Sequence, residues 1–205
     1  MSNFVNHIRP RQVPGRVLSV FYTFCLGGLS FLAFIILGIT GLLLMFHYLP
    51  GENTGFSSVL TLGSVLPYGG LLRNLHYWSA QIMVVTVNLH MLRVVWTHSY
   101  KPPRQLNWLV GVGLLILVLV LDFTGFLLVG SQESGAAATV AVNILKLIPG
   151  LGPGLAQIFL GRPSALSGST LAVYVWHCVG LPFAALFLQF YHFWRIRRDG
   201  GVRPL

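Results

Sequence analysis

The sequence predicts an all-α membrane protein, a bundle of four transmembrane helices. Of its 205 residues, 55% are hydrophobic and only 8% are charged, whereas soluble domains carry about 25% charged residues. Four apolar segments are each long enough to cross a hydrocarbon core about 30 Å thick. Two pairs of histidines recur within these segments at nearly equal intervals. We expect one domain over residues 1–205, too small to hold a separate soluble catalytic module beside its spans.

The four predicted spans cover about residues 17–47, 74–96, 106–129 and 170–194. The first span is longer than the apolar region of a signal peptide, which has about 7 to 15 residues, so we expect it in the mature protein. The connection before the fourth span contains two short amphipathic stretches, residues 136–147 and 155–160, separated by prolines and glycines. We expect both stretches to form surface helices along the outer membrane face.

Basic residues predict the orientation of the chain. They gather before the first span, between the second and third, and after the fourth: Arg9, Arg11, Arg16, Lys101, Arg104, Arg195, Arg197, Arg198 and Arg203. By the positive-inside rule, both termini face the inner side of a bacterial cytoplasmic membrane or a thylakoid-type membrane. A nucleic-acid surface is the competing explanation of the net charge of +9, and the position of the charges at span ends argues against it.

The histidine pairs are the most specific chemical signal in the chain. His76 and His90 lie 14 positions apart, and His177 and His192 lie 15 positions apart. At a rise of about 1.5 Å per residue, each pair is separated by roughly 21 to 23 Å along nearly one helix face. Two such helices facing each other would supply two histidines at each of two levels, the ligand set of two bis-histidine haems. Alternatively, each histidine is a neutral imidazole bonded to a neighbouring helix.

Glycines repeat the same interval on the other two spans. Gly27 and Gly41 lie 14 positions apart on the first span, as do Gly111 and Gly125 on the third. A flat macrocycle between two helices needs room at its edges, and glycine allows a close approach of backbone. Plain helix packing is the alternative explanation of each glycine pair.

Two arginines accompany the histidines of the second span. Arg73 lies three residues before His76, and Arg93 lies three residues after His90. Residues three apart share a helix face, and each arginine is displaced toward the nearer membrane surface. Both arginines therefore suit the propionate groups of a haem. The alternative is that both snorkel at helix ends.

These residues resemble the four-helix di-haem core of cytochrome b, specifically the split cytochrome b6 type in which this half is a separate subunit. The resemblance covers nearly the whole chain. It is carried by CLGG at 25–28, RNLHYWSA at 73–80, HMLR at 90–93, KPPR at 101–104, TGF at 124–126, His177, LP at 181–182 and HF at 192–193. The interval of 15 in the fourth span is similar to the b6 type, since the mitochondrial type usually has 14.

The resemblance implies one haem b on the outer side, held by His76 and His177, and one on the inner side, held by His90 and His192. Two axial imidazoles leave no open coordination position, so we expect electron relay rather than oxygen activation. The implied function is that of the di-haem cytochrome b subunit of a membrane quinol oxidoreductase of the bc or b6f type. We do not expect the subunit to turn over alone.

The implied partners are quinone or quinol, membrane lipid, a subunit like the C-terminal half of cytochrome b, a Rieske iron-sulfur protein and a c-type cytochrome, in a complex that is usually a homodimer. The alternative function is a haem b anchor of another quinone-linked respiratory oxidoreductase without a Rieske protein. A membrane scaffold without redox chemistry would require all four histidines to be structural.

Cys25 matches the cysteine that binds an additional c-type haem in the b6 family, through one thioether near the inner haem. The usual C-x-x-C-H attachment motif is absent from the sequence. Alternatively, Cys25 is a small buried apolar residue. Cys178 is expected near the opposite surface, too far from Cys25 for a disulfide, and we interpret it as a packing residue.

The chain also departs from the family pattern. Residues 129–134, Val-Gly-Ser-Gln-Glu-Ser, replace the Pro-Trp-Asp-Gln string that borders the outer quinol pocket in the family. The stretch from Ser131 to Ser134 is therefore the feature that favours the alternative function. An arginine expected a few residues before His177 is missing as well.

Three further residues are candidates for quinone or proton chemistry: Asp122, Glu133 and His98. Asp122 is either a proton carrier or a neutral structural acid, because an acid within a span is costly unless paired, protonated or hydrated. Glu133 is either a proton acceptor at the outer quinone pocket or a solvated loop residue. His47 and His98 lie at span ends, where interfacial anchoring is the alternative role, and His98 is predicted on the inner, quinone-reducing side.

Overall fold

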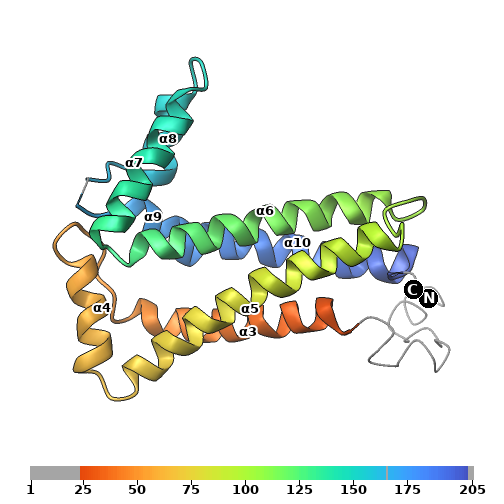
Figure 1. Ribbon diagram of the computed structural model, residues 1–205, viewed down its shortest axis with the longest axis horizontal. Helices are drawn as coiled ribbons and strands as arrows, with labels where there is room; N and C mark the ends of the chain where they lie inside the picture. The colour runs from red at the N-terminus through yellow and green to blue at the C-terminus, as the bar shows by residue number, and fades with distance from the viewer. Residues whose placement is uncertain (1–23, 165, 203–205) are drawn as a thin grey trace, which may run out of the picture.

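The computed structural model describes residues 24–164 and 166–202, and within these ranges the chain is helical. Four helices have the length and composition to cross a membrane (Figure 1): α3 (Leu26–Met45), α5 (Gly69–Trp96), α6 (Gln105–Leu128) and a continuous helix over Leu171–Asp199. The fourth consists of α9 (Leu171–Val175), a π turn (Trp176–Gly180) and α10 (Leu181–Asp199). The all-α, four-span prediction is therefore confirmed.

The helix ends differ from the predicted spans, because hydropathy marks only the apolar part of a helix. The second span was expected to begin near residue 74, yet α5 begins at Gly69, where an added Cβ would lie 2.1 Å from the Leu62 carbonyl oxygen. The fourth was expected to end near residue 194, yet α10 continues to Asp199, whose carboxylate pairs with Arg195 one turn earlier at 2.5 Å. Residues 17–23 of the first predicted span lie outside the described residues.

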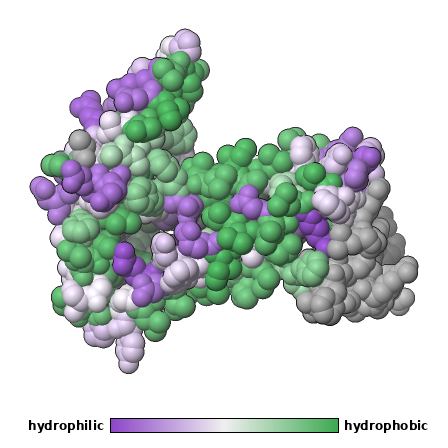
Figure 2. Space-filling model, viewed as in Figure 1, coloured by the Kyte–Doolittle hydropathy of each residue, from purple (hydrophilic) through white to green (hydrophobic). Residues whose placement is uncertain are grey.

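The bundle consists of two helix pairs, because α5 packs most closely against α3 and α10 packs most closely against α6. Ala33, Met83 and Val118 form a small buried cluster between helices near the middle of the bundle. Most other apolar side chains of the bundle point outward, which produces the hydrophobic surface seen in Figure 2. Such a surface suits contact with lipid.

Three shorter helices lie at one end of the bundle (Figure 1), which we call the outer end after the predicted orientation; the opposite end is the inner end. They are α4 (Gly55–Ser64), α7 (Gln132–Lys146) and α8 (Gly152–Leu160). The sequence predicted α7 and α8 with later starts and did not predict α4. The α7 helix starts earlier because Ser131 caps it by accepting a hydrogen bond from the Ser134 amide, and Pro153 fits the first turn of α8.

Tyr48 joins the outer ends of the helix pairs. Its hydroxyl donates to the Leu128 carbonyl oxygen at 2.6 Å and lies 2.7 Å from the Ser169 hydroxyl. Burial raises the pKa of Tyr48 to about 12, so this hydroxyl remains a donor at neutral pH. The Tyr48 ring also stacks on Tyr174, with ring centres 5.6 Å apart. These contacts fix the end of α3 against α6 and α9.

Candidate cofactor sites between the helix pairs

The outer histidine pair faces inward from the two helix pairs. His76 projects from α5 and His177 from the π turn, and their ring centres are 6.4 Å apart with an interplanar angle of 69°. Metal–imidazole bonds of about 2.0 Å, with about 1.1 Å from each ring centre to its nitrogen, would put the ring centres about 6.2 Å apart. The observed separation therefore has room for one metal ion between the two rings.

Threonine hydroxyls set the orientation of both outer imidazoles. Thr40 Oγ1 lies 2.9 Å from His76 Nδ1, and Thr124 Oγ1 lies 3.0 Å from His177 Nδ1. Each hydroxyl has one proton, which it donates to a carbonyl oxygen one turn earlier, at 2.7 Å for Thr40 and 2.9 Å for Thr124. Each threonine oxygen must then accept from Nδ1–H, which leaves Nε2 of both histidines with the lone pair that a metal needs.

Each predicted glycine lies against one histidine. A Cβ added at Gly41 or Gly125 would lie 3.0 Å from Cε1 of His76 or His177, respectively. The structure thus brings the glycines to the imidazole rings themselves, rather than only to the edge of a macrocycle as expected from the sequence. The tight spacing keeps both outer rings close to the backbone of α3 and α6.

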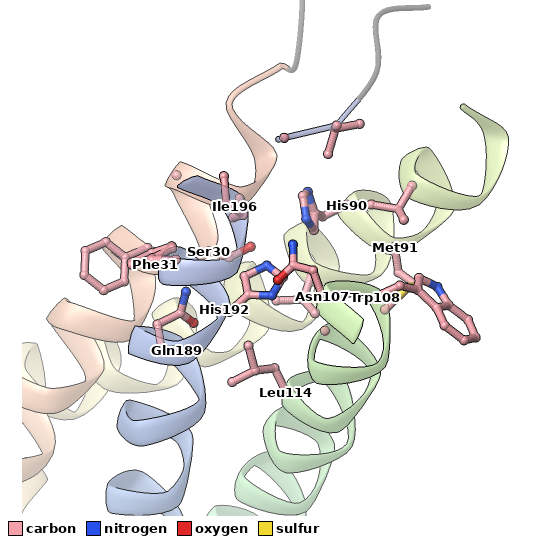
Figure 3. Close-up of a pocket in the computed structure, with 18 of the residues that line it drawn as sticks. Ser30, Phe31, His90, Met91, Asn107, Trp108, Leu114, Gln189, His192 and Ile196 are labelled. Atoms are coloured by element: carbon pink, nitrogen blue, oxygen red, sulfur yellow. The ribbon is translucent and has the colours of Figure 1, made fainter. Parts of the chain in front are cut away.

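The inner histidine pair lines a cavity of about 310 Å³ near the inner end of the bundle. Figure 3 shows His90 from α5 and His192 from α10 among its lining residues, with Asn107 of α6 close to His192. Gly27 and Gly111 also line the cavity, and an added Cβ would lie 3.4 Å from His90 Cε1 and 3.6 Å from His192 Cε1, respectively.

The two arginines of α5 differ in burial: Arg93 near the inner end is buried, and Arg73 near the outer end is exposed. Arg93 is only 7% exposed, and its guanidinium carbon lies 5.6 Å from the centre of the Phe24 ring. Arg73 is exposed, and nothing in the structure assigns it to the outer site. Arg104 was predicted as a topology signal and as part of the KPPR string, but not as a site residue. It lines the inner cavity, and its buried Nε and Nη1 have no hydrogen-bond partner among the described residues. An anionic group in the cavity would satisfy Arg104.

The remaining candidates lie away from the paired histidines. Cys25 is exposed in a left-handed conformation (φ 50°) just before α3, two positions from the cavity-lining Gly27. Cys178 lies in the π turn at the opposite end of the bundle. His98 has a φ of 53° in the inner loop, with Nδ1 3.0 Å from the Trp96 carbonyl oxygen. His47 is exposed just beyond the outer end of α3.

The two candidate acids have different surroundings. Asp122 Oδ1 accepts a hydrogen bond of 3.3 Å from the Gln81 amide, which links α6 to α5 within the span. Glu133 is exposed in the first turn of α7. A hydrogen bond from the Ser131 side chain, followed by one from the backbone, lowers the pKa of Glu133. Glu133 is therefore a weaker base than an ordinary glutamate, which does not favour the proton-acceptor alternative.

Opposed histidines at two levels of a four-helix bundle define a class of membrane protein that can hold planar metal cofactors through two imidazoles each. The family model described as cytochrome b/b6/petB matches residues 12–200. The chain is 38% identical to the cytochrome b6 of Heliomicrobium gestii, over 97% of this chain and 92% of that protein. It is 34% identical to the menaquinol:cytochrome c reductase cytochrome b subunit of Geobacillus thermodenitrificans, over 99% and 91% of the two chains. This chain belongs to the cytochrome b/b6 family.

A solved structure described as a hyperthermophilic respiratory Complex III has the same fold, with a TM-score of 0.74 and 23% sequence identity. The match covers all of this chain and 56% of that one, so the chain spans about half the length of its structural relative. Membership of the family implies haem b binding and electron transport in a membrane. The donor set of the histidine pairs and the unpaired buried nitrogens of Arg104 fit haem and its propionates.

Proposed function

We propose that the chain is the di-haem subunit of a membrane quinol oxidoreductase of the bc or b6f type and relays electrons between two quinone sites. The observation that carries this proposal is the pairing of α5 and the fourth helix at two levels, His76 with His177 and His90 with His192. Fourteen helical residues separate the levels on α5, which corresponds to about 21 Å. Two haems at these levels would span most of a hydrocarbon core of about 30 Å.

The protein's own contribution is positioning and electrostatics. When bound, haem b supplies a one-electron iron couple. Two histidines would hold the haem at each level, and with both imidazoles bound its iron would carry electrons rather than bind dioxygen. Thr40 and Thr124 hold the outer imidazoles in the tautomer that can bind iron. Two arginines would provide positive charge for the propionates of an inner haem: Arg104, which lines the inner cavity, and the buried Arg93 near the inner end of α5.

Transfer between the levels would be coupled to the membrane potential. We place both termini on the inner side, as the basic residues predict, so electrons move inward from the outer level. Moving one charge across a potential of 100 mV corresponds to about 2.3 kcal/mol, and transfer over most of the thickness involves most of that energy. The membrane is a bacterial cytoplasmic or thylakoid-type membrane.

Cys25 is proposed to attach a third, c-type haem through one thioether. The support is the match of Cys25 to the b6 pattern and its exposed position next to the inner cavity. Exposure argues against the alternative in which Cys25 is a small buried apolar residue. A haem at this position would lie near the inner level, where the family reduces quinone.

The proposed partners are the other subunits of the complex to which this chain belongs. A split cytochrome b is supported by the match to the cytochrome b6 of Heliomicrobium gestii, which covers 92% of that protein, whereas the match to the Complex III chain covers 56%. A separate subunit equivalent to the remaining half, a Rieske protein and a c-type cytochrome would complete a dimeric complex that uses quinol. The second candidate function, an anchor for a complex without a Rieske protein, is favoured by the altered stretch from Ser131 to Ser134, which caps α7 at the outer end.

A pyridine haemochrome spectrum of the purified native complex, recorded before and after acid-acetone extraction, tests the cofactor content. Two extractable b haems per chain, with a c-type signal retained on the polypeptide, are expected. Retention of no c-type signal would contradict the role of Cys25 alone, and no haem at all would contradict the proposed function. Identification of the co-purified subunits by mass spectrometry separates the two candidate functions, because only the first includes a Rieske protein.

A further inference from the structure

The two helices that bear the histidines have different numbers of residues between them, yet their histidines lie at the same two levels of the bundle. On α5 the histidines are 14 residues apart, and on the fourth helix they are 15 residues apart. In regular α-helices the first interval ends about 40° short of a whole number of turns and the second about 60° past it. If one of His177 and His192 faced its partner on α5, the other would then be rotated away from its own partner by about 100° around the helix axis.

The structure nevertheless brings both histidines of the fourth helix to their partners. His177 faces His76, and His192 lines the same cavity as His90. The glycines of α6 give an independent measure of this spacing. Gly111 and Gly125 are 14 residues apart, and yet a Cβ added to them would lie 3.6 and 3.0 Å from Cε1 of His192 and His177, respectively. One residue of the fourth helix is therefore taken up between the two histidines.

The π turn at Trp176–Gly180 accounts for that residue. It is the only π turn within residues 24–164 and 166–202, and it contains His177. The Leu181 amide donates to the carbonyl oxygen of Trp176, five positions earlier, instead of to a carbonyl four positions earlier. A turn closed by an i→i+5 bond contains one more residue than an α-helical turn.

The local sequence explains why the π turn forms at this place. Pro182 has no amide proton, and in an α-helix its ring would meet the carbonyl of Cys178, whereas a local π adjustment relieves both conflicts. Gly180 lets the Trp176 ring lie against the turn, since an added Cβ would come within 2.4 Å of that ring. Trp176 is held in turn by its indole N–H, which donates to the Ile158 carbonyl oxygen at 3.0 Å.

We propose that this π turn is a register device that takes up the additional residue of the fourth helix, so that both of its histidines match the two levels of α5. Gly180 and Pro182 are the positioning residues that place the turn at His177 and directly after it. This inference rests on the proposed function, because register matters only if both levels hold a haem. It predicts that the turn and the additional residue can be removed together without loss of either haem.

The test is the double variant in which Val179 is deleted and Pro182→Ala removes the cause of the π turn. Val179 is 45% exposed, so its deletion removes little buried contact. The matched control is deletion of Val85, a 57% exposed residue between the histidines of the all-helical α5. Haem per polypeptide is measured by pyridine haemochrome in full-length chains purified from native membranes, and EPR separates the two levels.

The wild-type chain and the double variant are expected to hold two b haems each, while the chain without Val85 holds no more than one. The inference is overturned if the double variant loses a haem or if the chain without Val85 keeps both. Deletion of Val179 alone replaces the double variant if the latter does not accumulate in the membrane, and the inference is also overturned if this single deletion does not yield a chain with two haems. A wild-type chain without haem would instead refute the proposed function.

Discussion

Thr124 Oγ1 lies 3.0 Å from Nδ1 of His177 and donates its only proton to the carbonyl oxygen of Val120. The threonine is therefore an acceptor for the imidazole, and Thr40 has the same relation to His76. An acceptor at Nδ1–H makes an axial imidazole more basic and stabilises the oxidised, more positive iron. Both hydroxyls are therefore expected to lower the potential of a haem held at the outer level.

Replacement of Thr124 by valine should raise the midpoint potential of the outer haem. A net hydrogen-bond contribution of about 0.5 to 1.5 kcal/mol corresponds to at most about 20 to 60 mV for one electron. Potentiometric titration of the α-band absorbance measures the shift. Thr86→Val is the matched control, because Thr86 is buried on α5 and bonds to Ser30 rather than to a histidine. An equal shift in both variants would contradict the role of Thr124.

Replacement of His90 or His192 by alanine should remove the inner haem and leave the outer haem in place. The reason is that each level has its own pair of imidazoles, one from α5 and one from the fourth helix. EPR and low-temperature optical spectra report the two haems separately. The reciprocal variant, His76→Ala, should remove only the outer haem. Spectra in which both haems persist in either variant would refute the assignment.

Alanine in place of Gly41 or Gly125 should reduce occupancy of the outer level several-fold. Glycine to alanine ordinarily favours a helix by about 1 kcal/mol, yet here the new Cβ would lie 3.0 Å from an imidazole carbon. The ring would have to move away from its threonine partner. Haem content per chain measures the effect.

The same substitution elsewhere provides graded controls. Gly38 has no atom within 4 Å of an added Cβ, so Gly38→Ala should be neutral or stabilising. Gly27 and Gly111 leave 3.4 and 3.6 Å, which is close to ordinary contact, so their alanine variants should retain the inner haem. Equal losses at all of these positions would point to general helix packing instead of close approach of the outer rings.

Glu133→Gln should leave the pH profile of quinol oxidation unchanged between about pH 6 and 8. The hydrogen bond from Ser131 lowers the pKa of Glu133, so the carboxylate remains charged throughout this range. Any stability from this bond is present above the ordinary carboxyl pKa and disappears only as the pH falls through the lowered one. Steady-state assays of the native complex measure the profile, and a shifted profile would identify Glu133 as a proton acceptor.

Asp122→Asn should retain quinone-linked turnover, because an asparagine oxygen can still accept the hydrogen bond from Gln81. Asp122→Leu removes that acceptor and should lower the thermal stability of the bundle without changing the haem spectra. The two variants are compared by stopped-flow haem reduction and thermal unfolding. Slow turnover of the asparagine variant with an intact bundle would assign the acid to proton transfer.

Hydropathy and histidine spacing were sufficient to predict four membrane helices and the elements that bear the paired histidines. Spacing alone also predicted glycines near them, because an interval of 14 residues returns a helix to nearly the same face. It did not show that the glycines meet the imidazoles themselves. That detail depends on how closely α3 approaches α5 and how closely α6 approaches α10.

Three features were not predicted from the sequence: the threonine hydroxyls at the outer imidazoles, the α4 helix and the π turn. A threonine precedes Gly41 and Gly125 alike, and this repeated Thr-Gly pair was a usable signal for the hydroxyls at the outer imidazoles. The α4 helix escaped prediction because it is short and two of its three buried residues, Gly55 and Ser58, are not apolar. The π turn could not be predicted from average helix geometry, although Pro182 marks its position.

The arrangement in two helix pairs has a consequence for biogenesis. The pair α3 and α5 comes from the first part of the chain, and the pair α6 and α10 comes from the second part, so each can associate soon after its own insertion into the membrane. The four histidines lie where the two pairs meet. We therefore expect haem to bind only after the two pairs have met, and haem supply to affect the lifetime of newly made chains exposed to membrane proteases.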